Sequence, residues 1–183
     1  MTPVHLIPDA LSATECAALV ALCQSAPMKD ARVVRQTTAH QIRRAELSWL
    51  DDLPEAPWVM DRMMRLVAQA NREAFGFELT EFAESPQVAR YGAEREGHFD
   101  WHSDIGAGAL AAKRKLTIVV QLSDPADYEG GILELRPDAS IRQAPQARGT
   151  AILFPSFVLH RVTPVTTGTR WSLTLWSHGP AFR

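Results

Sequence analysis

The chain has 183 residues, of which 46% are hydrophobic, enough for one domain with a substantial core and too few for two ordinary domains. Its 19 basic and 21 acidic residues give a formal net charge of -2, so the charge favours neither a polyanionic partner nor an anionic membrane surface. We therefore expect no nucleic acid and no membrane among its partners. Composition leaves the oligomeric state open.

The N-terminal segment has no basic stretch leading into a long apolar one, and no apolar run approaches the length of a membrane span. We expect a soluble, unprocessed, cytoplasmic protein. Its two cysteines, Cys16 and Cys23, lie seven residues apart in a predicted helix, hence on one face and too distant for a disulfide. Two buried thiols in a reducing compartment are expected.

Two helices are predicted in the first half of the chain. Ser12-Ala-Thr-Glu15 is a capping-box pattern that opens an Ala- and Leu-rich stretch ending near Pro27. A second helix is predicted from about 56 to 75, with Gly76 as its stop. Its apolar stripe, typical of core packing, consists of Met60, Met63, Met64, Val67 and Ala70. Between the helices, 31–50 is expected to form short polar strands or loops without catalytic residues.

From Gln87 onward the sequence predicts short strands separated by Gly, Pro and Asp turns. The expected strands are 87–92, 98–104, 115–122, 131–136, 150–154, 157–163 and 170–177. Two helices followed by strands at this spacing predict an α+β, mainly β fold, a double-sheet jelly roll braced by N-terminal helices. No repeat or linker marks a boundary, so we expect 1–183 to be a single domain, with helical support over about 1–80 and a jelly-roll core over about 85–180.

A His-x-Asp pair, His102 and Asp104, lies in the second of these predicted strands. Residues two apart on a strand point to the same face, so the imidazole and the carboxylate can bind one ion from one side. With His160 they would form the two-His, one-carboxylate set that is typical of non-haem Fe(II) sites that activate O2. However, His98 and Asp100 form a second pair on the same strand face, and spacing alone does not separate the two.

The blocks around these residues resemble, in order and spacing, the 2-oxoglutarate- and Fe(II)-dependent dioxygenases, within them the prolyl 4-hydroxylase-like branch. The resemblance covers roughly residues 85 to 180, and its segments are Tyr91–Asp104, Arg114–Ser123, Tyr128–Leu135, Phe154–Val165 and Gly168–Trp176. It implies a double-stranded β-helix that uses Fe(II), 2-oxoglutarate and O2, with ascorbate as an optional reductant. The implied reaction hydroxylates an unactivated C–H bond of an amino-acid-like or peptidyl substrate, prolyl substrates included.

The resemblance also separates the two His-x-Asp pairs. The family pattern places a large aromatic residue three positions before the metal-binding His. Phe99 holds that place for His102, whereas Arg95 would hold it for His98. The implied catalytic, metal-binding residues are therefore His102, Asp104 and His160, and His98 becomes a neighbour at the entrance or a solvated strand residue.

Arg170 lies ten residues after His160 and, by the resemblance, anchors 2-oxoglutarate together with Ser172, which shares its strand face. An arginine fork can pair with the far carboxylate of this co-substrate through two parallel charge-assisted hydrogen bonds. Tyr91 stands where related enzymes place a pocket-lining tyrosine. Gln121 lies on the strand face that, by the resemblance, is turned toward the co-substrate, so we expect it to form a hydrogen bond there.

Two other functions share this architecture. Cupin-like binding proteins typically supply a His-x-His pair and a Glu, and no His-x-His occurs in this sequence. Oxidative demethylases of alkylated nucleic acid usually carry a second arginine six residues after the 2-oxoglutarate arginine, where this chain has Trp176. Hydroxylation is the preferred interpretation and the other two are alternatives. The sequence does not choose among free amino acids, peptides and other metabolites as the substrate.

Overall fold

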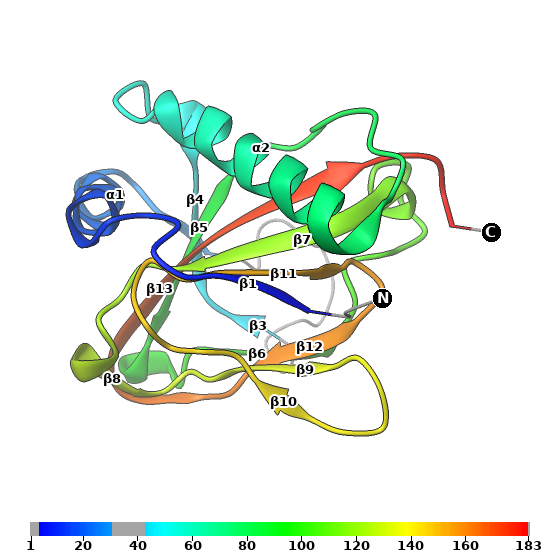
Figure 1. Cartoon of the computed structure of the whole chain (residues 1–183). Helices are drawn as coiled ribbons and strands as arrows, with labels where there is room; N and C mark the ends of the chain where they lie inside the picture. Colours follow the sequence, from blue (N-terminus) through cyan, green and yellow to red (C-terminus); the bar gives the residue numbers. More distant parts are fainter. Residues whose placement is uncertain (1–3, 31–42, 183) are drawn as a thin grey trace.

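The computed structural model describes residues 4–30 and 43–182. These residues form two antiparallel sheets that pack face to face, with two helices against the outer face of the larger sheet (Figure 1). The helices are α1 (Ala13–Ser25) and α2 (Trp58–Ala70), and a π-helical turn, Asn71–Phe75, extends α2. The mainly β jelly roll with supporting helices is therefore confirmed.

The larger sheet has eight strands in the order β1, β11, β7, β13, β5, β4, β2, with β8 paired to β13. Their bounds are β1 His5–Ile7, β2 Lys29–Asp30, β4 Glu46–Trp49, β5 Gln87–Gly92, β7 Arg114–Gln121, β8 Tyr128–Gly130, β11 Ala151–Pro155 and β13 Val165–His178. The smaller sheet has five strands in the order β10, β9, β12, β6, β3. Their bounds are β3 Arg43–Arg44, β6 His98–His102, β9 Leu133–Arg136, β10 Arg142–Gln143 and β12 Leu159–Val162.

The two faces of strand β7 pack against different parts of the fold, one against the helices and the other against the smaller sheet. Successive side chains of a strand point to opposite faces. Leu116, Ile118 and Val120 accordingly pack in the core between the larger sheet and the helices. The alternate residues Thr117 and Val119 face the smaller sheet and line the space between the two sheets. The inner face of this strand is thus available for a functional site, while its outer face attaches the sheet to the helices.

Both helices begin or end as their sequences predict. The Ser12 Oγ accepts a hydrogen bond from the Glu15 N–H at 3.1 Å, and the Glu15 carboxylate accepts one from the Ser12 N–H at 2.8 Å, which completes the capping box. After the π-helical turn, Gly76 adopts a left-handed conformation with a φ of 69°. A residue without a Cβ tolerates this conformation most easily, so the chain leaves the helix there.

The two cysteines lie on the buried face of α1 as free thiols. Burial raises the pKa of Cys16 to about 11 and also raises the pKa of Cys23, so both thiols stay protonated at neutral pH. Within residues 4–30 and 43–182, no helix is both long and apolar enough to cross a membrane.

The predicted strand 98–104 is too long. Strand β6 ends at His102, and Asp104 lies beyond it, where its backbone N–H donates to the Ser156 carbonyl at 2.9 Å. His102 and Asp104 therefore do not share a strand face. They come together because the chain turns out of β6 toward the segment that follows β11.

Strands β1, β2, β8 and β10 were not predicted. They have two or three residues each, too few to show an alternating pattern. Strands β1 to β4 all precede residue 50, so the N-terminal part supplies strands to both sheets in addition to its helices. The predicted strands or loops over 31–50 fall partly on residues 31–42, which lie outside the described residues, and 43–49 form β3 and β4.

Candidate metal centre

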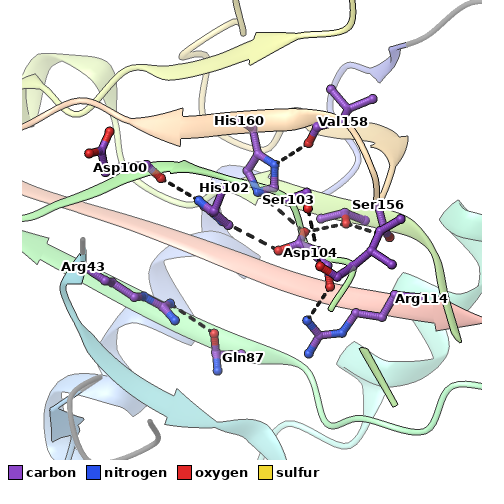
Figure 2. Close-up of polar contacts among 12 residues, drawn as sticks. Arg43, Gln87, Asp100, His102, Ser103, Asp104, Arg114, Ser156, Val158 and His160 are labelled. Carbon is purple, nitrogen blue, oxygen red and sulfur yellow. Dashed lines mark hydrogen bonds and ion pairs between the residues drawn. The ribbon is translucent and has the colours of Figure 1, made fainter. Parts of the chain in front are cut away.

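Three side chains converge between the sheets, one each from β6, β12 and the segment after β6. His102 and His160 are Cα partners on neighbouring antiparallel strands. The His102 Nε2 lies 3.7 Å from one Asp104 carboxylate oxygen, and the His160 Nε2 lies 3.5 Å from the other (Figure 2). One ligand atom from each residue can be chosen so that all lie within 4.8 Å of one another. Two imidazoles and a carboxylate at this separation can bind one divalent first-row metal ion.

Both imidazole rings of the cluster are oriented by hydrogen bonds of their Nδ1 atoms, the nitrogens that point away from Asp104. The His102 Nδ1 lies 2.7 Å from the Asp100 carbonyl oxygen, and the His160 Nδ1 lies 2.9 Å from the Val158 carbonyl oxygen (Figure 2). A carbonyl can only accept, so each Nδ1 carries the proton and each Nε2 presents a lone pair to the cluster. The Phe99 ring stacks on His102 with a centroid distance of 3.5 Å and holds that ring from one side.

The protonation states also suit metal binding. Burial, reinforced by the neighbouring His160, lowers the pKa of His102 to about 3, so this imidazole is neutral at physiological pH. Burial would raise the pKa of Asp104, but His160, His102 and the Thr117 hydroxyl together hold it below its ordinary value. A neutral imidazole and an ionised carboxylate are the forms that bind a metal ion.

The Asp104 carboxylate is held by the larger sheet. The Thr117 Oγ1 on β7 donates to Asp104 Oδ2 at 2.7 Å, and the Ser156 hydroxyl lies 3.0 Å from the same Thr117 oxygen. Asp104 is 9% exposed, so this hydrogen bond is shielded from water. Partners of this kind fix the orientation of a ligating carboxylate and contribute to metal affinity.

A second group of residues supports Asp104 from its backbone side. Arg114 donates through Nη1 to the Asp104 carbonyl at 3.1 Å and through Nε to the Glu84 carboxylate at 2.6 Å (Figure 2 shows the Asp104 contact). Glu84 also contacts the Nε2 of the fully buried His178 at 2.9 Å. The Arg114 guanidinium lies 4.0 Å from the centroid of the Trp176 ring, which lines the cavity. The segment after β6 is thereby attached to the first residue of β7 and, through Glu84, to the last residue of β13.

The cluster opens into a cavity of about 450 Å³, part of it open to solvent, which also contains Arg170. Arg170 projects from β13 and is 1% exposed. Its Nη2 donates to the Gln121 Oε1 at 2.9 Å, but Nε and Nη1 are buried and have no hydrogen-bond partner among residues 4–30 and 43–182. Burial lowers the pKa of Arg170, an effect opposed by Tyr91 and Tyr128, yet a guanidinium stays charged. Two orphaned cationic donors suit a carboxylate ligand.

The structure places the other predicted residues as follows. Ser172 and Tyr91 line the same cavity, and the Arg170 guanidinium lies 5.4 Å from the centroid of the Tyr91 ring. Gln121 is not among the cavity-lining residues, because its amide donates to the Pro145 carbonyl at 3.0 Å and accepts from Arg170. His98 lies outside the cluster, with its Nδ1 2.8 Å from the Glu96 carbonyl oxygen.

Sequence reasoning missed three residues at this site. Trp176, to which the sequence alone assigned no role in the site, lines the cavity together with Arg170 and Ser172 on β13. The alternation of strand residues, extended by four positions from Ser172, could have indicated this. Arg43 and Gln87 also line the cavity. Nothing in the local sequence signals Arg43, because β3 has only two residues and reaches the site through pairing with β6. Gln87 shares a face of β5 with Tyr91, so strand alternation could have indicated it.

Comparison with known proteins gives a consistent result. The family model described as the 2OG-Fe(II) oxygenase superfamily matches residues 86–178. A PKHD-type hydroxylase of Pseudomonas aeruginosa is 34% identical over an alignment of 86 residues, with coverage of 44% of this chain and 38% of that relative. This chain thus spans about two fifths of that relative's length.

Solved structures show the same fold over nearly the whole chain. A Pseudomonas putida prolyl-4-hydroxylase is 24% identical, with a TM-score of 0.76 and coverage of 97% of this chain and 93% of that one. A prolyl hydroxylase of Trichoplax adhaerens, in complex with a hypoxia inducible factor oxygen degradation domain peptide fragment, is 19% identical, with a TM-score of 0.79 and coverage of 97% and 84%. The sheets described above therefore have the same fold as these two prolyl hydroxylases, the double-stranded β-helix.

Proposed function

Because this chain belongs to the 2OG-Fe(II) oxygenase superfamily, we propose that it is an Fe(II)- and 2-oxoglutarate-dependent hydroxylase of an amino-acid-like or peptidyl substrate, prolyl residues included. The observation that carries the proposal is a single cavity that contains both the His102, Asp104 and His160 cluster and the unpaired donors of Arg170. One part suits a divalent metal ion and the other suits a carboxylate.

In this proposal His102, Asp104 and His160 hold Fe(II) through two neutral nitrogens and one carboxylate oxygen. When bound, Fe(II) and 2-oxoglutarate supply oxidation of a C–H bond by O2, with conversion of the co-substrate to succinate and CO2. The chain supplies the positions of the three ligands, which the Nδ1 contacts of both rings and the Thr117 hydroxyl fix in advance.

Arg170 receives the far carboxylate of 2-oxoglutarate through Nε and Nη1, the two donors left without a partner. Gln121 is a positioning residue, since its hydrogen bond to Nη2 turns the guanidinium fork toward the cavity. Ser172 and Tyr91 provide further hydroxyl groups on the walls of the same cavity. The side chains of Val119, Leu133 and Val162 form apolar wall that excludes water from the reacting groups.

Hydroxylation as the reaction class is supported by the names of the similar proteins and by one residue that differs from the pattern of nucleic-acid demethylases. The similar proteins are named PKHD-type hydroxylase and prolyl hydroxylase, and one of them is in complex with a peptide fragment. A nucleic-acid demethylase would be expected to have an arginine at position 176, where the cavity is lined by Trp176. We also propose ascorbate as an optional cofactor, a reductant outside the balanced reaction.

The test is a product analysis with purified protein, Fe(II), 2-oxoglutarate and isotopically labelled O2. The substrates are free amino acids, proline-containing peptides and methylated oligonucleotides. We expect succinate formation coupled to a stable product that has gained one oxygen atom from O2. Stoichiometric formaldehyde from a methylated base, without a hydroxylated amino-acid product, would overturn the proposal in favour of a demethylase. If no succinate forms, neither with any of these substrates nor in their absence, the oxygenase assignment itself is overturned.

A further inference from the structure

We propose that Arg43 binds a carboxylate of the substrate, so that the enzyme acts on a free amino acid or a C-terminal residue in preference to the corresponding amide. The inference rests on the proposed function, because it assigns the substrate class of the same cavity. It is argued from where Arg43 lies, from what its guanidinium contacts, and from the charge that remains in the cavity once the metal and co-substrate are counted.

Arg43 lies close to the metal cluster although it is distant from it in the sequence. It begins β3, one of the two edge strands of the smaller sheet, and its Cα partner on β6 is Phe99. The guanidinium lies 4.6 Å from the centroid of the Phe99 ring, and that ring stacks on His102 at 3.5 Å. Only one aromatic ring therefore separates this cation from a proposed metal ligand. An anion bound by Arg43 would lie within the length of a small molecule from the metal.

Not every buried hydrogen-bond donor of the Arg43 guanidinium has a partner among the described residues. Its Nη2 donates to the Gln87 Oε1 at 3.3 Å, a neutral acceptor at a long distance (Figure 2). Its Nε is buried and has no hydrogen-bond partner among the described residues. Buried donors of a charged group are normally paired, since an unpaired one loses its hydration without compensation. A carboxylate is the ligand that best fits a guanidinium with a donor left over.

The charges that line the cavity lead to the same ligand class. With both imidazoles bound to the metal as neutral ligands, the charged lining residues within 4–30 and 43–182 are Arg43, Arg170 and Asp104, two positive and one negative. Fe(II) carries two positive charges and 2-oxoglutarate two negative ones, so their binding leaves the sum at one positive charge. Arg170 is taken by the co-substrate in the proposed function. The remaining positive charge is that of Arg43, and a carboxylate group of the substrate would pair with it locally.

The geometry restricts which carboxylate can do this. Because Arg43 and the metal cluster are separated by one ring, the substrate carboxylate must lie a few bonds from the C–H group that is oxidised. A free amino acid or the last residue of a peptide meets this condition. An internal prolyl residue has only neutral carbonyl groups at that distance, so a substrate of that kind would leave Arg43 without a charged partner.

The experiment compares each acid with its neutral amide in the full-length, Fe(II)-loaded protein. The probes are the twenty standard amino acids, with L-proline first, a proline-terminated tripeptide, and the C-terminal amides of all of these. Substrate-stimulated succinate formation is measured for the wild type and for Arg43→Gln. We expect at least one acid to be hydroxylated and its amide to be a poor substrate, and Arg43→Gln to raise KM for the acid about 10- to 100-fold with a smaller change in kcat.

Arg44→Gln is the matched control. It removes the same charge from the next residue of β3, which is exposed and forms an ion pair with Glu96 at 3.0 Å. This variant should keep the KM of the wild type, whereas an equal rise in both variants would show a general charge effect and overturn the inference. Amides that react as well as the acids, or a panel in which no acid reacts, would also overturn it.

Failure of this inference is distinguishable from failure of the proposed function. Substrate-independent succinate formation and a titration of 2-oxoglutarate into the Fe(II) protein require no knowledge of the substrate. If both succeed and the acids show no advantage, Arg43 does not select carboxylates and the oxygenase assignment stands. If both fail, the oxygenase function is wrong, and the inference about its substrate is wrong with it.

Discussion

The two sheets contribute to the cavity in different ways. The larger sheet presents Arg170 and Thr117 from long strands, β13 with 14 residues and β7 with eight, whose outer faces pack on both helices. The smaller sheet presents His102 and His160 from strands of five and four residues. One of its two edge strands, β3, has only two residues and supplies Arg43. Arg170 thus projects from a strand that is packed into the main core, whereas His102, Asp104, His160 and Arg43 lie near strand ends.

This difference suggests that different parts of the fold determine the binding of different ligands. A group on a long strand inside a packed core has little freedom to move, which suits a co-substrate that is the same in every turnover. Short strands and the segments that follow them can change in sequence without disturbing that core. We therefore expect the larger sheet to determine co-substrate affinity, the cluster to determine metal affinity, and the β3 edge to determine which substrate is accepted.

The largest expected effect comes from removing one ligand of the cluster. His102→Ala, Asp104→Ala and His160→Ala should each abolish Fe(II)-dependent succinate formation and greatly weaken Fe(II) binding, because the loss of one of three ligands removes both affinity and geometry. His98→Ala is the control and should have a mild effect, since His98 lies outside the cluster. An inactive His98→Ala together with an active His102→Ala would show that the other His-x-Asp pair is the ligand pair.

The second largest effect distinguishes co-substrate binding from metal binding. Arg170→Ala should weaken 2-oxoglutarate binding by about 2 to 5 kcal/mol, because the far carboxylate is left buried without its charged partner. Fe(II) affinity should stay close to that of the wild type. Titration of the metal-to-ligand charge-transfer band measures the first quantity, and Fe(II) binding without co-substrate measures the second. Unchanged 2-oxoglutarate affinity would exclude Arg170 as the anchor.

A smaller effect tests whether the larger sheet also supports the metal end. Thr117→Val removes the hydroxyl that donates to Asp104 at 2.7 Å while keeping the shape of the side chain. We expect metal affinity to fall about 10- to 100-fold, the usual consequence of losing a hydrogen bond to a metal ligand. Thr150→Val, at a buried position that does not line the cavity, is the matched control. Equal metal affinity in both variants would mean that Thr117 has no positioning role.

The smallest effect concerns the stability of the metal-free protein. Burial lowers the pKa of His102 from 6.5 to about 3, so between these values the unfolded chain binds a proton that the folded chain does not. Stability should therefore decrease as the pH falls through this range, by up to about 1.4 kcal/mol per pH unit from this residue. Denaturant unfolding between about pH 5 and 6.5, above the range of the carboxyl groups, should show a smaller slope in His102→Gln. An identical slope in the variant would contradict the assignment.

Much of the fold and of the central cluster could be predicted, because the signals are local. The capping box of α1, the alternation along β7 and the spacing of the His and Asp residues can each be recognised within a few residues. The two-residue strand β3 gives no such signal, and neither does the contact of Arg43 with Phe99, which depends on pairing between distant segments. The predicted shared strand face for His102 and Asp104 was wrong, because a tertiary hydrogen bond to Ser156 turns the chain after β6.

The support of Asp104 was likewise beyond local reasoning. Arg114, Glu84 and His178 come from three separate segments and form one network only in the folded chain. A sequence pattern can identify a residue that binds a metal by its chemical type. It cannot show which distant residues hold that ligand in place, since those contacts are set by how the sheets pack.

The central claim is that one cavity binds the metal ion at His102, Asp104 and His160 and the far carboxylate of 2-oxoglutarate at Arg170. The most direct test is a crystal structure of the full-length protein with Mn(II), as a redox-stable substitute for Fe(II), and 2-oxoglutarate. Anomalous diffraction should show one metal peak within coordination distance of the three ligands, and the co-substrate should extend from it to the Nε and Nη1 of Arg170. A metal peak at His98 and Asp100, or 2-oxoglutarate directed away from Arg170, would contradict the claim.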